Sequence, residues 1–144
     1  MISSLTHIEG SIKESVSIKA KEEIEKILED YGSKTDIDAI ALTSKDGVPV
    51  ASYLEKEKEQ ESFSTLSATI LGAGEVIFSG FEKKKPDLFV GHSEDSVLLI
   101  KGIDTDMALS LLADSDKEKE LKRDIEEIAS KIGELSDTFE IGGI

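Results

Sequence analysis

The sequence predicts an α+β fold, an α-β-β-α-β-β-β-α sandwich in which helices cover a five-stranded antiparallel sheet. Its apolar residues change from a helical period to a strand period in the order helix, two strands, long helix, three strands, helix. The links between consecutive strands are too short for anything but antiparallel connections. The chain has 144 residues, 38% of them hydrophobic, which is enough for one domain with a substantial core.

The amino-terminal part predicts a weakly amphipathic extension, residues 1–17, followed by a firmer helix over 18–31. Gly10 and several serines interrupt the apolar pattern of the extension. Gly32 is expected to end the helix, because glycine favours the left-handed conformation found just after helix termini. The apolar residues that define these patterns are Ile2, Leu5, Ile8, Ile12 and Val16, then Ile24, Ile27, Leu28 and Tyr31.

Two strands follow, over residues 36–44 and 48–53. The first is nearly continuous in apolar residues, which is typical of a strand covered on both faces. The second contains Pro49, which cannot donate a ladder hydrogen bond and so belongs at a sheet edge. Asp46-Gly47 tolerates positive φ and predicts a two-residue type I′ turn between the strands.

A long helix is predicted over residues 62–84, after the acidic segment 55–61. One face carries an apolar stripe at three- and four-residue steps, and another carries small residues that would let a second backbone approach. The stripe consists of Phe63, Leu66, Ile70, Ala73, Ile77 and Phe81, and the small residues are Ser64, Ala68, Gly72 and Ser79.

Three strands, 87–92, 96–103 and 107–113, form an antiparallel meander, and a last helix covers 115–136. Ser115 and Glu118 have the spacing of a capping box at the start of this helix. We therefore divide the chain into the extension 1–17, one domain over 18–136 and a tail over 137–144.

The charge of the chain limits its partners. There are 31 acidic and 17 basic residues, for a net charge of −14, which disfavours nucleic acid and insertion into a membrane surface. The single basic cluster, Lys83-Lys84-Lys85, is expected to offset the negative end of a helix dipole. The absence of cysteine and of a signal-peptide core favours a cytoplasmic protein.

Residues that could carry catalysis are few. The two histidines, His7 and His92, lack partners at metal-ligand spacing, and the stretch "GAGE" (72–75) lacks the ending of a phosphate-binding loop. Arg123 is the only arginine, a weak basis for an arginine finger. We therefore predict no catalytic, cofactor-binding or metal-binding residue, and no cofactor.

The order of elements resembles the Roadblock/dynein light chain superfamily. Three segments carry the resemblance: the strand–turn–strand piece "AIALTSKDGVPVAS" (39–52), the long helix (62–81) and the meander (88–113). Together they span most of residues 18–136.

This resemblance implies a non-enzymatic homodimer, or a heterodimer with another Roadblock-family chain, that regulates or scaffolds small Ras-like GTPases. In family dimers the third strand and second helix pair across a two-fold axis, and these are residues 87–92 and 62–84 here. The resemblance assigns no role to the extension. The residues themselves support such an interface, since an apolar edge strand needs cover; the alternative is that both elements are buried within one chain. The expected interface residues are Ser64, Ala68, Gly72, Leu88, Phe89 and Val90.

Two other functions stay open on the sequence. One is a dynein-type or other assembly adaptor that acts without a GTPase. The other is a small-ligand sensor or enzyme on a profilin-like sandwich, which the lack of a catalytic set disfavours. Binding of a nucleotide-loaded Ras-like GTPase would distinguish a GTPase regulator or scaffold from the adaptor.

Overall fold

The computed structural model describes the backbone of residues 2–54 and 60–139, and the side chains of residues 18–54 and 62–135. Along the chain, the elements follow the predicted order α-β-β-α-β-β-β-α, so the α+β fold class is confirmed. Their bounds are α1 Ile2–Thr35, β1 Ala39–Ser44, β2 Pro49–Leu54, α2 Gln60–Gly80, β3 Phe89–His92, β4 Ser96–Ile103, β5 Met107–Asp114, the 3₁₀ turn η2 Ser115–Lys117, and α3 Glu118–Phe139.

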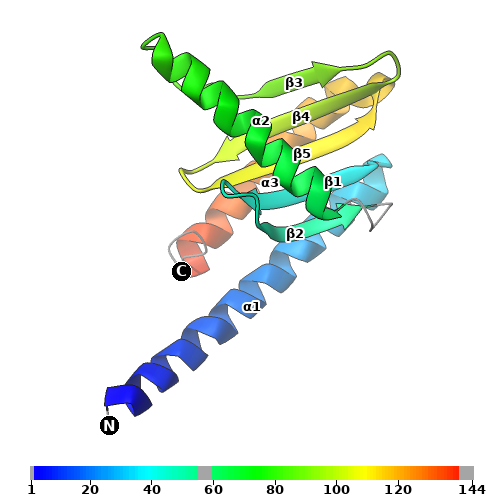
Figure 1. Cartoon of the computed structure of the whole chain (residues 1–144). Helices are drawn as coiled ribbons and strands as arrows, with labels where there is room; N and C mark the ends of the chain where they lie inside the picture. The colour runs from blue at the N-terminus through cyan, green and yellow to red at the C-terminus, as the bar shows by residue number, and fades with distance from the viewer. Residues whose placement is uncertain (1, 55–59, 140–144) are drawn as a thin grey trace.

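The five strands form one antiparallel sheet in the order β2-β1-β5-β4-β3. The helix α2 crosses one face of this sheet, while α1 and α3 cover the other (Figure 1). β2 with Pro49 lies at one edge, as its sequence predicts, and β3 lies at the opposite edge. The amino-terminal half of α1 projects away from the sheet (Figure 1).

The two faces of the sheet have very different cores. The larger core joins α1 and α3 to the sheet, and the alternation of apolar residues along each strand directs every second side chain into it. The smaller core, beneath α2, is a cluster of Leu71, Ile100 and Ala108, with Phe89 and Leu98 partly buried against it. Fully buried members of the larger core include Ile24, Leu28, Ile40, Leu42, Leu99, Leu109, Leu111, Leu121, Ile125 and Ile128.

The turn between β1 and β2 differs from the type I′ prediction. Only Gly47 has a positive φ, of 91°, whereas a type I′ turn needs positive φ at both central residues. Gly47 N–H donates to the Ser44 carbonyl, and Ser44 N–H donates to the Val48 carbonyl, both at 2.9 Å. These bonds define a three-residue loop, a turn closed by one left-handed glycine, so the dipeptide indicates the hairpin correctly but its type wrongly.

The first helix is longer than predicted at both ends, running from Ile2 to Thr35 without a break at residue 17. Gly32 does not end it. Asp36 takes the left-handed position instead, with φ of 57°, and Ile37 N–H donates to the Gly32 carbonyl at 3.0 Å, as in a Schellman motif. Glycine is required at position 32 for another reason, because a Cβ there would lie 2.3 Å from the ring of Tyr53 on β2.

The end of α2 and the start of α3 also differ from prediction. α2 stops at Gly80, and Glu82, with φ of 56°, closes a second Schellman motif in which Lys83 N–H donates to the Phe78 carbonyl. The capping box is wrong: Ser115 N–H donates to the Asp95 carbonyl, and the Glu118 carboxylate pairs with His92 and Lys122. The segment 55–59 and residues 140–144 of the tail lie outside the described residues. The division of the chain at 1–17, 18–136 and 137–144 stays a prediction.

Candidate functional site

The most distinctive surface of the protein is the apolar side of α2. Leu66, Ile77 and Phe81 expose 59%, 61% and 75% of their surface, although the sequence pattern would suit a face buried in a core. Large apolar side chains that gather on one exposed helix face are typical of a protein-interaction site. The other large exposed apolar residues of this helix are Ile70, Val76 and Phe78.

The small residues of α2 face the sheet of the same chain. Ser64 and Ala68 are 0% and 4% exposed, and opposite them the sheet also carries small side chains, Ala108 and Ser110. The backbone that approaches α2 is therefore that of its own sheet. Ser64 and Ala68, which the sequence prediction placed at a contact with a second chain, are already buried within this chain, and the apolar stripe is left outside.

Two interactions show which side of α2 points to which part of the sheet. Gly74 lies under the ring of Phe89 on β3, since a Cβ at Gly74 would come 1.9 Å from Phe89 Cζ. Residues three or four positions apart share a side of a helix, so Ile70 and Ile77 lie on the side of Gly74, toward β3. We call Leu66, Ile70 and Ile77, together with Phe81 directly after the helix, the α2 stripe.

The opposite side of α2 is fixed to the β1–β2 turn. Lys45 Nζ lies 3.0 and 3.1 Å from the two carboxylate oxygens of Glu75, and Thr65 Oγ1 donates to the Gly47 carbonyl at 3.3 Å. Gly72 lies on this side, where a Cβ would meet nothing within 4 Å inside the chain. Glu75 is the only charged residue between 62 and 81, and its charge is matched within the chain.

The edge strand β3 continues the exposed surface. Leu88 and Phe89 are half-buried, while Val90 is 37% exposed. β3 pairs with β4 on one side, and no strand of the described residues lies on its other side. The open backbone of β3 and the α2 stripe therefore lie at the same edge of the molecule.

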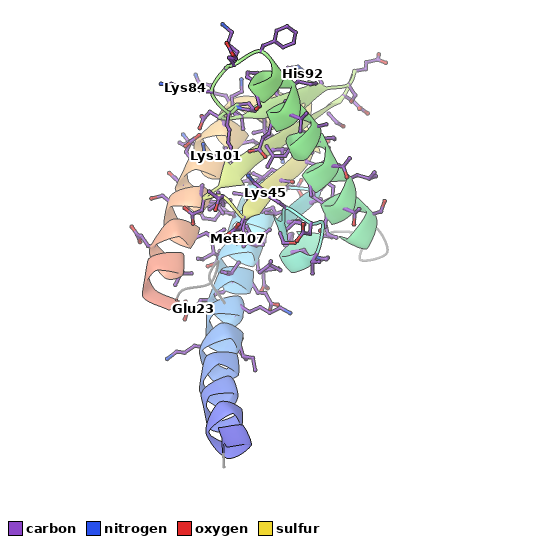
Figure 2. All side chains as sticks on the ribbon, turned by 60° about the vertical axis from the view of Figure 1, so that its left-hand side comes forward. Glu23, Lys45, Lys84, His92, Lys101 and Met107 are labelled. Carbon is purple, nitrogen blue, oxygen red and sulfur yellow. The ribbon has the colours of Figure 1, made fainter. Side chains whose placement is uncertain are left out.

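A cluster of lysines lies between α2 and β3 along the chain. Lys83, Lys84 and Lys85 are exposed just after α2, and Figure 2 shows Lys84 at the top of the view, beside the end of that helix. Lys101, labelled below it, is different because it contacts Asp87 at 2.8 Å and Glu126 at 3.3 Å. Desolvation lowers its pKa, but these ion pairs outweigh that effect, so the pKa of Lys101 is raised.

The remaining polar candidates form surface contacts. His92 Nε2 lies 2.6 Å from Glu118 Oε1, and Lys122 contacts the other Glu118 oxygen at 2.9 Å. Hydrogen bonds from Lys122 and then His92 lower the pKa of the Glu118 carboxyl. Arg123 is exposed on α3, and the side chain of His7 lies outside the described residues.

The described part of the chain contains no group of three or more His, Cys, Asp or Glu side chains placed to hold a metal ion. Within the same residues, no helix combines the length and apolar character needed to cross a membrane.

Comparisons with known proteins identify the fold. No protein-family model matches the sequence, and no curated protein matches it. The structure is similar to Myxococcus xanthus MglB, with a TM-score of 0.77, 11% identity, and coverage of 83% of this chain and 91% of that one. It is also similar to the gliding protein MglB of Thermus thermophilus, with a TM-score of 0.74, 15% identity, and coverage of 83% and 92%.

A third similar structure is a Roadblock/LC7 domain from Streptomyces avermitilis, with a TM-score of 0.62, 13% identity, and coverage of 67% of this chain and 82% of that one. The chain therefore has the Roadblock/LC7 fold that its sequence resemblance implied.

The sequence contained a signal for the orientation of α2 that its apolar period hides. The stripe alone indicates a buried face. However, Gly102 and the small residues Ala108 and Ser110 lie on strands predicted to be central. A sheet face made of small residues fits the small side of a helix, and matching these two patterns would have placed the stripe outside.

Proposed function

We propose that the chain forms a symmetric dimer through β3 and the α2 stripe, and that this dimer is a non-enzymatic regulator or scaffold for a small Ras-like GTPase. The observation that carries the proposal is the coincidence of an open strand edge and exposed apolar residues on one side of the molecule. Antiparallel pairing of two β3 strands would satisfy the open backbone groups, and the same two-fold axis would bring two α2 stripes together.

The interface proposed here revises the residues expected from the sequence. Phe89 and Val90 keep their place, because β3 is the strand that would be extended. Leu88 precedes this strand and flanks it. The stripe takes the place of Ser64, Ala68 and Gly72, since two of these support α2 from beneath and the third lies on the far side.

A matched pair of variants tests this interface. Ile77→Asp places a charge on the side of α2 that faces β3, and Val76→Asp places the same charge one residue away on the opposite side. Both native residues are aliphatic and mostly exposed, at 61% and 72%, so neither change empties the core. We expect Ile77→Asp to give monomers in sedimentation velocity, because it would bury an unpaired charge between two helices.

The control variant, Val76→Asp, should sediment as the native protein does. If both variants dissociate equally, or if neither does, the two-fold contact does not use the stripe and the proposed interface is wrong.

A GTPase is proposed as partner on the strength of the fold. Two of the similar structures are MglB proteins, one of them described as a gliding protein, which supports a regulator of motility-type systems. The test is a pull-down with small Ras-like GTPases, each loaded in turn with GDP and with a non-hydrolysable GTP analogue. Retention that depends on the nucleotide would support the proposal, and no retention of either form would favour the adaptor reading.

Arg123 distinguishes a scaffold from a catalytic activator. Its side chain is exposed on α3, on the sheet face opposite α2. We expect Arg123→Ala to leave any stimulation of GTP hydrolysis within a few fold of native. A loss of about a hundredfold or more with binding intact would make it an arginine finger and would contradict the scaffold mechanism.

A further inference from the structure

The last turn of α2 extends past the edge of its own sheet. Gly74 lies on the ring of Phe89 in β3, and β3 is the last strand of the described residues on this side. The turn of α2 that follows Gly74 therefore passes beyond the sheet, as the end of the helix beyond β3 in Figure 1 shows. Phe78 belongs to this overhanging turn.

Phe78 lies on the side of α2 that faces the sheet. It follows Leu71 by seven residues, which is about two helical turns, so the two residues share a side of the helix. Leu71 is 1% exposed and packs in the smaller core, whereas Phe78 is 39% exposed. The difference arises because the sheet beneath Leu71 ends before it reaches Phe78.

Gly91 on β3 is a glycine that its own chain does not require. A positive φ occurs at Gly47 among the described glycines, so the backbone of Gly91 suits any residue. A Cβ at Gly91 would meet Leu98 Cβ at 3.8 Å, an ordinary contact, and no nearer atom of the described residues. Glycine weakens a strand, and it often marks a place where another group approaches closely.

The open side of Gly91 is on the sheet face that α2 covers. Gly91 pairs with Leu98 on β4, and Leu98 and Phe89 both pack against the smaller core beneath α2. Side chains alternate between the faces of a strand, so Phe89 and Gly91 are the two positions of β3 on this face. Phe89 is covered by Gly74 of its own chain, whereas Gly91 is exposed.

The two-fold axis of the proposed dimer relates these two features. If β3 pairs antiparallel with β3 of a second copy, the axis is perpendicular to the joined sheet, and both α2 helices lie on the same face. The overhanging turn of each copy then extends over the edge strand of the other. Such an interface is isologous, so a contact between two residues occurs twice, once in each direction.

We propose that Phe78 of each copy packs on Gly91 of the other, and that this reciprocal contact fixes how the two copies align. The ring occupies the room that the missing side chain leaves, beside the apolar surface of Leu98. The partner that fits is a second copy of this chain, because it carries both the ring and the open glycine. The inference rests on the proposed dimer and identifies the residues that give it specificity.

Two single variants test the contact from its two sides. Phe78→Ala removes a partly exposed ring, and Gly91→Phe adds a ring where a Cβ makes an ordinary contact, so both chains should fold. We expect each variant alone to raise the dissociation constant of the dimer about tenfold or more in sedimentation velocity. The first loses the ring contact in both directions, and the second brings two rings into one space.

A mixture of the two variants gives the sharper test. One contact of the mixed dimer is native, and the other places the new ring against the shortened side chain, so the mixed dimer should exceed random pairing. The variants differ in mass, so native mass spectrometry measures each dimer. Phe81→Ala is the matched control: it lies in the α2 stripe and is 75% exposed, and with Gly91→Phe it should pair at random.

The outcomes separate this inference from the proposed dimer. Random pairing of Phe78→Ala with Gly91→Phe, while the native chain is dimeric, would overturn the reciprocal contact and leave the dimer in place. An equal preference for the mixed dimer in the Phe81→Ala control would also overturn it, because the effect would then not be specific to Phe78. A native chain that is monomeric in the same measurements would overturn the dimer and the contact together.

Discussion

Three glycines of the described residues have two different reasons to be glycine, and only the structure separates them. Gly47 has a positive φ in the hairpin turn. Gly32 and Gly74 each lie against an aromatic ring from a neighbouring strand, Tyr53 and Phe89. Sequence reasoning placed Gly32 at a helix end because that is the commonest local role of such a glycine. A contact with a ring far along the chain leaves no local sign.

Gly74 and Gly72 allow a matched test of how α2 packs on β3. Gly74→Ala would place a methyl group in the ring of Phe89, and we expect it to lower the free energy of unfolding by about 1–3 kcal/mol. Gly72→Ala meets nothing within 4 Å and should raise it by about 0.5–1 kcal/mol, because alanine favours helix. Urea denaturation of the two variants measures both changes. Equal effects of the same sign would contradict the assigned packing of α2 on β3.

Glu82 gives a second prediction for single residues. It ends α2 with φ of 56°, a conformation that strains most side chains and suits glycine. Glu82→Gly should raise the free energy of unfolding by about 0.5–1 kcal/mol. Glu82→Ala, which keeps a Cβ, serves as the control and should not stabilise the protein. A gain in both variants would mean that removal of the negative charge, and not backbone strain, is responsible.

A few ion pairs link neighbouring elements, and for one of them we expect stability to depend on pH. Glu118 at the start of α3 is bonded by Lys122 and by His92 at the end of β3, and its pKa is lowered from 4.5. A carboxyl with a lowered folded pKa adds stability that is complete above its unfolded pKa and is lost as pH falls through the folded value.

Comparison of native protein with Glu118→Gln measures this contribution. We expect the native protein to have the higher unfolding midpoint at pH 7, and the difference to shrink as pH falls below 4.5, the ordinary pKa of a glutamate carboxyl, toward the lower pKa of the folded state. A difference that stays constant from pH 7 to about 3 would mean that charge at Glu118 does not stabilise the fold.

The elements themselves were largely predictable from the sequence. Helices and strands occur in the predicted order, and β4 has its predicted bounds, because a central strand has a continuous apolar signal. The predicted helix ends were wrong where a tertiary contact or an uncommon backbone conformation decides them. Asp36 and Glu82, and not glycines, take the left-handed conformation at two helix ends. Which side of α2 faces the sheet was not predicted, because an apolar stripe does not by itself show whether it packs against the same chain or against another chain.

In the whole molecule, the net charge opposes self-association, while the apolar surface of the proposed interface favours it. Each chain carries −14, so two copies repel each other at long range, while the stripe between them is uncharged. We therefore expect self-association to strengthen as salt rises from about 0.02 to 0.5 M, because salt screens the repulsion. Analytical ultracentrifugation across this range measures the dissociation constant. Weaker association at high salt would show that ion pairs, with Lys83–Lys85 as the nearest candidates, hold the copies together.

Binding of a partner protein should respond to salt in the opposite sense if that partner presents a basic patch. The acidic chain would attract such a partner, and association would slow as salt rises. Stopped-flow measurement of the association rate with the retained GTPase would test this, and a rate that does not change with salt would exclude steering by net charge.

The molar mass of the native chain in solution is the direct test of the proposed dimer. The proposed dimer predicts twice the 15.6 kDa of one chain in light scattering at micromolar concentration, because β3 and the α2 stripe would then be covered. A mass of one chain under the same conditions would mean that no second copy covers these surfaces, and the proposed dimer would be wrong.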